Sequence, residues 1–165
     1  MRNTLLAFAT LVLLATVSCP AYAQRAVIIV RHADRLDQSE DSPLSQAGED
    51  RAQRLASLLK DAGITAIYTS QRQRTRKTAE PLASALKVKP VSIPVADHRE
   101  PLLDRIRADN RDDVVLIVSH ETTVPVLLKL LGYPGEIAIA RTEYDNLFVV
   151  VPQGNSPPTV VRLRY

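Results

Sequence analysis

Short, continuously apolar runs alternate along this chain with longer segments in which apolar residues recur every three or four positions. The runs AVIIV (26–30) and VVLIVS (114–119) are both rich in β-branched residues. Continuous runs of this kind are typical of strands that are covered on both faces of a sheet. ITAIYTS (64–70) and the shorter VSIPV (91–95) predict two further strands.

Four of the longer segments have the period of amphipathic helices. They span residues 45–63, 71–86, 100–110 and 122–132. Ser45 is the expected N-cap of the first helix, because its hydroxyl can accept a hydrogen bond from the first turn.

The end of the chain predicts an antiparallel pair of strands at one edge of the sheet. NLFVVV (146–151) and TVVRLRY (159–165) are the two strands, and PQGNSPP (152–158) is the turn between them. Strands that alternate with helices of this length favour a mostly parallel sheet with helices on both faces. The predicted fold class is therefore α/β, a three-layer α/β/α sandwich with a mostly parallel central sheet, formed by one domain over residues 24–165.

The first residues have the pattern of an export signal. Arg2 precedes an apolar run, and Ala21 and Ala23 form a cleavage site of the A-x-A type. The apolar run is shorter than the roughly 20 residues that cross a bilayer. We therefore expect residues 1–23 to be a secretory signal peptide that is cleaved after Ala23. The mature protein is then periplasmic or secreted, without stable insertion into the membrane.

Composition narrows the possible chemistry. Cys19 is the only cysteine, and it lies in the predicted signal peptide, where a lipoprotein anchor is the alternative to cleavage after Ala23. A mature chain without a thiol excludes disulfides and cysteine catalysis. The formal net charge is +3 and aromatic residues are few, so we expect no nucleic-acid partner. We also expect a monomer.

Polar side chains follow two of the predicted buried strands. Arg31 and His32 end the first strand, and His120 ends VVLIVS. The carboxyl ends of parallel strands meet at one edge of a sheet, so we expect both histidines in one pocket. Zinc is the other common use of histidine, but three histidines without His-x-x-His spacing argue against it. We therefore expect neither a metal nor a cofactor.

Basic residues gather in the first turns of the second predicted helix, at Arg72, Arg74, Arg76 and Lys77. The helix macrodipole disfavours each positive charge there by about 0.3–1 kcal/mol. A bound phosphate would offset this repulsion, although a solvated basic face explains some of the four equally well. A pocket of histidines and arginines favours phosphoryl transfer, in which a neutral imidazole attacks phosphorus.

Four segments in this order resemble the histidine phosphatase superfamily, whose fold is called phosphoglycerate mutase-like. VRHAD (30–34) resembles the strand that ends in Arg-His-Gly, with Ala33 at the usual glycine position. The other three segments are PLSQAGEDRAQRLA (43–56), YTSQRQRTRKTAEPLA (68–83) and VSHETTVPVLL (118–128). The likeness extends over nearly the whole predicted mature chain and implies the same fold.

The resemblance implies roles for individual residues. It makes His32 the residue that is phosphorylated, while Arg31, Arg74 and His120 hold the phosphoryl group. It favours Glu121, which directly follows His120, as the proton donor to the leaving group.

Some roles stay open at this point. Asp97, Glu100 or no acid at all are the alternatives for the proton donor. Asp34 either acts in the pocket or only pairs with Arg35. We expect His98 to lie in a solvated turn, because its neighbours are charged.

The function implied is an exported, metal-independent phosphatase that hydrolyses phosphomonoesters through a phosphohistidine intermediate. Its expected substrate is a phosphorylated small molecule or glycan. Mutase activity is not expected, because the chain is too short for the larger lid insertions of the mutases. The alternative is an exported module that binds phosphate or phosphorylated glycans without turnover.

Overall fold

Every apolar run predicted to be a strand lies in one six-stranded sheet of the computed structural model, which describes residues 25–110 and 112–165. The predicted signal peptide, residues 1–23, and with it Cys19, lie outside the described residues. In the described part of the chain, no helix is long and apolar enough to cross a membrane.

The strand order places β1 and β4 side by side in the middle of the sheet. The order is β3-β2-β4-β1-β5-β6. The strands are β1 (Ala26–Arg31), β2 (Ile64–Ser70), β3 (Val91–Ile93), β4 (Val114–Ser119), β5 (Asn146–Gln153) and β6 (Ser156–Arg164). The first four strands are parallel, whereas β5 is antiparallel to β1, and β6 to β5. The connection from β1 to β2 passes over the position that β4 later fills, and β5 then pairs with the other side of β1. Ligands bind beyond the carboxyl ends of parallel strands where the strand order changes direction in this way.

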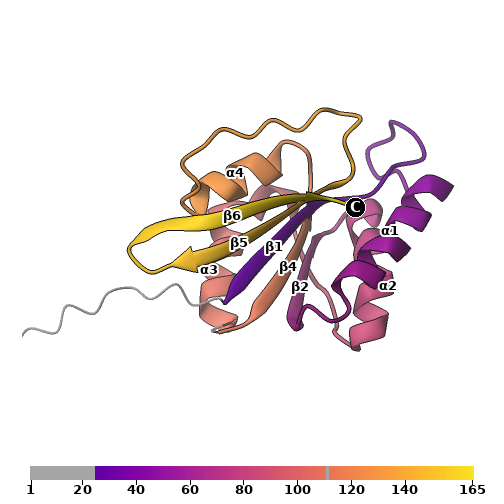
Figure 1. The fold of residues 1–165 in the computed structure, drawn as a ribbon. Coiled ribbons are helices and arrows are strands. Elements are labelled where there is room, and N and C mark those ends of the chain that lie inside the picture. The colour runs from indigo at the N-terminus through magenta and orange to yellow at the C-terminus, as the bar shows by residue number, and fades with distance from the viewer. Residues whose placement is uncertain (1–24, 111) are drawn as a thin grey trace, which may run out of the picture.

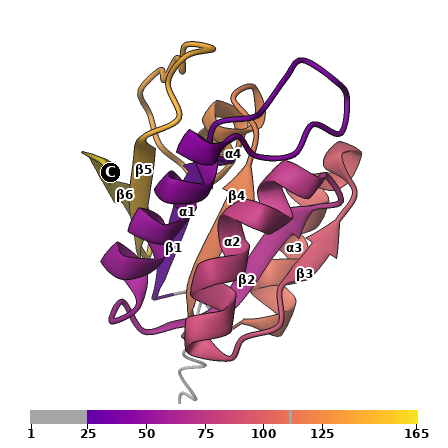
Figure 2. The same ribbon diagram turned by 90° about the vertical axis from the view of Figure 1, so that its right-hand side faces the viewer.

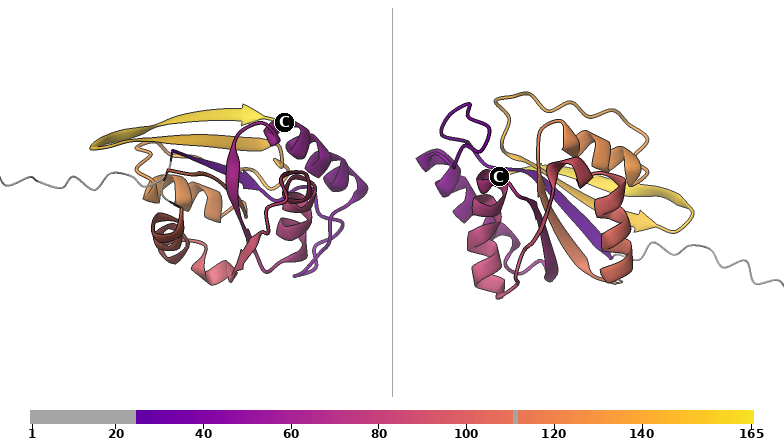
Figure 3. Two further views of the ribbon diagram at one scale, coloured as in Figure 1. Left: turned by 90° about the horizontal axis from the view of Figure 1, so that it is seen from below. Right: turned by 180° about the vertical axis from the view of Figure 1, so that it is seen from behind.

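Helices cover both faces of this sheet. Helices α1 (Gln46–Leu59) and α2 (Gln73–Leu86) lie on one face, and α3 (Glu100–Asp109) and α4 (Thr123–Leu130) on the other (Figure 2 and Figure 3). A short 3-10 helix, η1 (Val95–Asp97), precedes α3. The predicted α/β/α sandwich with a mostly parallel sheet is confirmed.

The central strands are continuously apolar because successive side chains enter two different cores. In β1, Ile28 and Val30 pack with the helices α1 and α2, while Val27 and Ile29 pack with α3 and α4. All four side chains are buried. Both layers of helices are needed to bury β1. Arg31 and His32, at the end of this strand, are the exception to its apolar pattern.

The terminal hairpin differs from the prediction in its turn. The strands β5 and β6 extend to a Gln153–Ser156 pair, so the turn contains only Gly154 and Asn155 instead of seven residues. Gly154 has a φ of +55°, which glycine adopts without steric cost. Of the prolines in the predicted turn, Pro152 lies near the end of β5, and Pro157 and Pro158 lie in β6, an edge strand (Figure 1), where a missing backbone N–H is tolerated.

The start of α1 is packed tightly against the segment that follows β1. Ser45 caps the helix by accepting a hydrogen bond from the Gly48 amide at 3.2 Å, as predicted. A Cβ at position 48 would lie 2.1 Å from the carbonyl oxygen of Asp34. Only glycine fits this close approach. The contact fixes the backbone two residues beyond His32.

Candidate active site

The two histidines expected in one pocket do lie together, and strand register explains why. Arg31 of β1 pairs with Ser119 of β4, so His32 and His120 are the next residues on adjacent parallel strands. The His32 amide donates to the Ser119 carbonyl at 2.9 Å. The two imidazole rings meet edge to face with their centroids 5.4 Å apart. Both side chains are buried, with 4% and 8% exposed.

A backbone hydrogen bond determines which nitrogen of His32 carries the proton. Nδ1 lies 2.8 Å from the carbonyl oxygen of Ala33. A carbonyl oxygen only accepts, so Nδ1 must be the protonated nitrogen and Nε2 keeps its lone pair. Burial lowers the pKa of His32 to about 3, and the charge of Arg74 contributes in the same direction. The ring is therefore neutral at physiological pH, which a nucleophile requires.

His120 is held by hydroxyl groups at the end of β2. Its Nε2 lies 3.0 Å from Oγ of Ser70, and this hydroxyl in turn lies 2.9 Å from Oγ1 of Thr75 in α2. Burial, with a further contribution from Arg74, lowers the pKa of His120 to about 3. His120 is thus also neutral, and it is tied to the same helix that carries the basic cluster.

Four arginines line a cavity of about 320 Å³ in front of the histidines, namely Arg31, Arg35, Arg72 and Arg74. In three of them, Arg31, Arg35 and Arg74, the Nε group is buried without a hydrogen-bond partner among the described residues. A buried donor without a partner costs about 1–3 kcal/mol. Three such donors around one cavity fit an anion that accepts hydrogen bonds from all of them.

Arg31 is fixed more firmly than the other arginines. It is only 1% exposed, and its Nη1 donates to the carbonyls of Ala140, Arg141 and Glu143, each at 3.0 Å. Its Nη2 forms a 2.6 Å ion pair with Glu121. The guanidinium carbon also lies 3.9 Å from the centroid of the Tyr144 ring. Nε–H and the second N–H of Nη2 are not used by these contacts, so Arg31 keeps at most two of its five N–H groups for a ligand.

Two acidic residues from the loop between β1 and α1 lie beside the start of α2, which the sequence did not indicate. Asp41 Oδ1 accepts from the Gln73 amide at 2.8 Å, and Glu40 forms an ion pair with Arg72. The Glu40 carbonyl also accepts from Nη1 of Arg74 at 2.8 Å. The loop between β1 and α1 therefore supplies negative charge that offsets part of the repulsion at this helix end.

The basic cluster is divided between two cavities. Arg72 and Arg74 line the cavity in front of the histidines, whereas Arg76 and Lys77 line a different cavity between α2 and β3. Alternate positions near the start of a helix point in different directions, so four neighbouring cations cannot all reach one ligand.

The candidates for the proton donor are separated by the structure. Glu121 lines the cavity, 28% exposed, and Glu40 lines it as well, whereas Asp97 and Glu100 do not. The Glu121 carboxylate is engaged by Arg31, an arrangement that suits an acceptor better than a donor.

Asp34 pairs with neither Arg35 nor the ligand-facing arginines. Its Oδ2 accepts from Nε of Arg51 in α1 at 2.6 Å. The open question about Asp34 is thus answered in favour of an ion pair, although with a different arginine. The pair holds α1 against the segment after His32.

His98 differs most from the sequence prediction. It is fully buried rather than solvated, and its Nδ1 lies 3.0 Å from Oγ of Ser119. Its ring centroid lies 6.4 Å from that of His120. Burial lowers the pKa of His98. The prediction was wrong because its charged neighbours Arg99 and Glu100 are exposed, whereas His98, directly after the 3-10 helix, turns inward.

Three further residues at the site, Arg35, Glu40 and Tyr144, were not predicted. They come from the two connections that lie beyond the carboxyl ends of the strands (Figure 1). Irregular segments have no periodicity from which the direction of a side chain can be predicted. In the described residues, no group of three or more His, Cys, Asp or Glu side chains is arranged to hold a metal ion.

The first part of this chain is similar in sequence to a known family. Residues 27–94 match the histidine phosphatase superfamily (branch 1). The Escherichia coli O1:K1 / APEC protein named "Probable phosphoglycerate mutase GpmB" is 41% identical over 66 residues, which are 36% of this chain. The aligned region is 31% of that relative, so the chain matches about a third of its length.

Solved structures agree on the fold. The protein histidine phosphatase SixA, complexed with tungstate, superposes with a TM-score of 0.66 at 23% identity, over 84% of this chain and 96% of that chain. A mycobacterial glucosyl-3-phosphoglycerate phosphatase, Rv2419c, in a complex with VO3, gives a TM-score of 0.65 at 14% identity, over 86% and 98% of the two chains. At these identities the likeness concerns the fold. The sequence match to the superfamily itself covers less than half of the chain.

Proposed function

We propose that this protein belongs to the histidine phosphatase superfamily and is a phosphatase that hydrolyses phosphomonoesters through a phosphohistidine on Nε2 of His32. One observation carries the proposal. Three arginines whose Nε–H groups have no partner among the described residues line the same cavity as a buried, neutral imidazole whose Nε2 keeps its lone pair. Phosphoryl transfer uses such an arrangement, because it needs a nucleophile and donors that stabilise equatorial oxygens.

The first step transfers the phosphoryl group to the enzyme. The lone pair on Nε2 of His32 attacks phosphorus, the N–P bond forms, and the bond from phosphorus to the ester oxygen breaks. The leaving group departs with the electron pair of that bond. Nδ1 keeps its proton throughout, since the Ala33 carbonyl holds it at 2.8 Å. The positive charge that develops on the imidazole is offset by the phosphoryl oxygens.

The second step returns the enzyme to its starting state. A water molecule attacks the phosphorus of phosphohistidine, the N–P bond breaks, and inorganic phosphate leaves. The electron pair returns to Nε2. In both steps Arg74, Arg35 and Arg31 donate through their Nε–H groups, and His120 adds a neutral donor beside them.

Protonation of the leaving group is the weakest part of this site. We assign Glu121 as the proton donor when the leaving group needs one. Its carboxylate forms a 2.6 Å ion pair with Arg31, a contact that competes with one to the leaving group. The enzyme should therefore favour substrates whose leaving group is stable without a proton, such as aryl phosphates and phosphohistidine.

The pattern of residues 1–23 supports a periplasmic or secreted enzyme, and the substrate is then a phosphorylated small molecule or glycan of that compartment. N-terminal sequencing of the protein secreted by an expression host tests this directly. Export predicts a mature chain that begins at Gln24, whereas a chain that still begins at Met1 would contradict export.

The decisive test is mass spectrometry of the protein after mixing with an aryl phosphate and quenching at alkaline pH, where phosphohistidine survives. We expect one added phosphoryl group on His32, and none in His32→Ala. Binding of inorganic phosphate without an added group or turnover would favour the alternative, a module that only captures phosphate. Circular dichroism of His32→Ala shows whether the variant is folded.

A further inference from the structure

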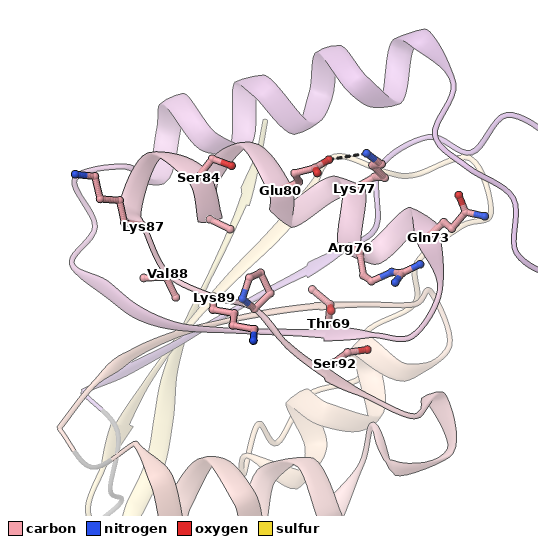
Figure 4. A pocket seen from close by; sticks show the side chains of 12 residues that line it. Thr69, Gln73, Arg76, Lys77, Glu80, Ser84, Lys87, Val88, Lys89 and Ser92 are labelled. Carbon is pink, nitrogen blue, oxygen red and sulfur yellow. Dashed lines mark hydrogen bonds and ion pairs between the residues drawn. The ribbon is translucent and has the colours of Figure 1, made fainter.

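A cavity of about 740 Å³ lies away from the histidines, between α2 and β3 (Figure 4). It shares no lining residue with the cavity in front of His32. Its volume falls within the range of small-molecule sites, about 300–1,000 Å³. The proposed phosphatase reaction uses none of its residues, so its composition needs an explanation of its own.

Positive charge dominates the lining. Arg76, Lys77, Lys87 and Lys89 contribute four cations, and Glu80 is the only carboxylate among the lining residues. Lys77 is paired with Glu80 at 2.8 Å. The other three cations form no ion pair within the described residues. Figure 4 shows Lys87 near one end of the cavity and Arg76 towards the other, with Lys89 between them.

The floor of the cavity carries a hydroxyl group without a partner. Thr69 and Ser92 are register partners on β2 and β3, so their side chains lie next to each other on the same face of the sheet. Thr69 is fully buried, and its Oγ1 has no hydrogen-bond partner in the described part of the chain. In Figure 4, Thr69 and Ser92 lie between Arg76 and Lys89. An acceptor placed there would contact a hydroxyl and two cations together.

The remaining lining is apolar. Ala83 at the end of α2, together with Val88 and Pro90 in the connection to β3, forms a surface without hydrogen-bond donors. The methylene chains of Lys87 and Lys89 add to it. A simple inorganic anion would use the cations and leave this surface uncovered, whereas a flat ring that carries anionic groups would use both.

We propose that this cavity binds a small organic polyanion, in which two or more anionic groups are joined to a flat apolar ring, at a site separate from the one around His32. The cations at the two ends hold the anionic groups, the hydroxyl of Thr69 satisfies its missing hydrogen bond, and the ring lies against Val88 and Pro90. This ligand is distinct from the phosphoryl group of the substrate.

The test uses pyrenetetrasulfonate, a fluorescent ring with four sulfonates that is not a phosphoester, titrated into the full-length protein. Lys87→Glu combined with Lys89→Glu should weaken binding about tenfold or more, because two attractive charges become repulsive. Thr69→Val should weaken it about threefold without lowering the melting temperature, since the hydroxyl has no partner to lose.

A matched control separates a site from general attraction to a basic surface. Lys60 is the C-cap of α1 as Lys87 is of α2, and Lys129 is exposed on α4. Lys60→Glu combined with Lys129→Glu makes the same change in net charge and should leave binding within about twofold. Equal weakening in both pairs, or no weakening in the Lys87 and Lys89 pair, would overturn the proposal.

Two further measurements distinguish this proposal from the proposed function. Orthovanadate, which mimics phosphate, should not displace the probe; displacement would place the probe at the histidines and contradict a separate site. Hydrolysis of an aryl phosphate by the Lys87 and Lys89 variant, without probe, reports on the His32 site alone. The two proposals can therefore fail independently.

Discussion

Nη2 of Arg31 and Oε2 of Glu121 form a 2.6 Å ion pair between a guanidinium that is 1% exposed and a carboxylate that is 28% exposed. The pair connects the residue that ends β1 to the second residue after β4. It therefore links the two strands that carry the histidines, and it makes Glu121 a positioning residue as well as the candidate acid.

Glu121→Gln distinguishes these two roles. Loss of a proton donor should slow hydrolysis of alkyl phosphates far more than that of nitrophenyl phosphate, because only the alkoxide needs a proton to leave. Loss of positioning alone should slow both by a similar factor. We expect the selective effect, with kcat for nitrophenyl phosphate within about fivefold of the wild type. A uniform decrease would leave Glu121 with the positioning role only.

Arg74→Lys tests the unpartnered guanidinium groups. Lysine keeps the positive charge but lacks the Nε–H group that is buried without a partner in Arg74. We expect kcat/KM for an aryl phosphate to fall about 100-fold or more, as when one preorganised donor is removed from a transition state. Arg54→Lys, on the exposed side of α1, is the control and should retain full activity. Similar rates for both variants would remove Arg74 from the site.

The buried histidines predict a loss of stability in mild acid. Their pKa values are about 3 in the folded protein, whereas an unfolded histidine has a pKa of about 6.5. Between these values the unfolded chain binds more protons, so the free energy of unfolding falls as the pH decreases. The slope is at most about 1.4 kcal/mol per pH unit for each histidine.

Urea unfolding at pH 7 and pH 5 measures this slope in a range above the titration of ordinary carboxyl groups. His120→Gln should reduce the difference between the two pH values, because one histidine no longer titrates. An unchanged difference would show that His120 is protonated in the folded protein.

Gly48→Ala sets two effects against each other. Helix propensity alone favours alanine by about 1 kcal/mol. The added Cβ, however, would lie 2.1 Å from the carbonyl oxygen of Asp34, a backbone atom that moves only if the segment after His32 moves. Overpacking of this kind costs about 1–3 kcal/mol, so we expect a net loss of stability and a lower kcat. Gln53→Ala, on the exposed face of the same helix, should not destabilise the protein; a Gly48→Ala variant of equal stability would show that the contact can relax.

The prediction from sequence succeeded where the pattern is periodic. Ile28 and Ile29 enter the cores on opposite faces of the sheet, as expected of a strand covered on both faces. The closeness of His32 to His120 follows from the parallel register of their strands. It failed where direction depends on tertiary contacts. His98 lies inside because of the turn at the end of η1, and no local pattern indicates that turn.

The same limit applies to charge. The sequence placed Arg74 and Arg76 in one cluster, but they face two cavities. Glu40 and Asp41, which neutralise the start of α2, come from a loop more than thirty residues earlier in the chain. Their part in the site depends on where that loop lies in three dimensions, which composition and periodicity do not contain.

The hydrogen bond between His32 and its own neighbour Ala33 has a consequence for how this site tolerates change. In many enzymes a carboxylate side chain orients the histidine, and one substitution removes it. Here the orienting group is part of the main chain, so no replacement of a side chain deletes it. The path of the backbone therefore determines which nitrogen of His32 is protonated. Only a change that bends this path, such as a bulkier residue at position 48, would remove the hydrogen bond.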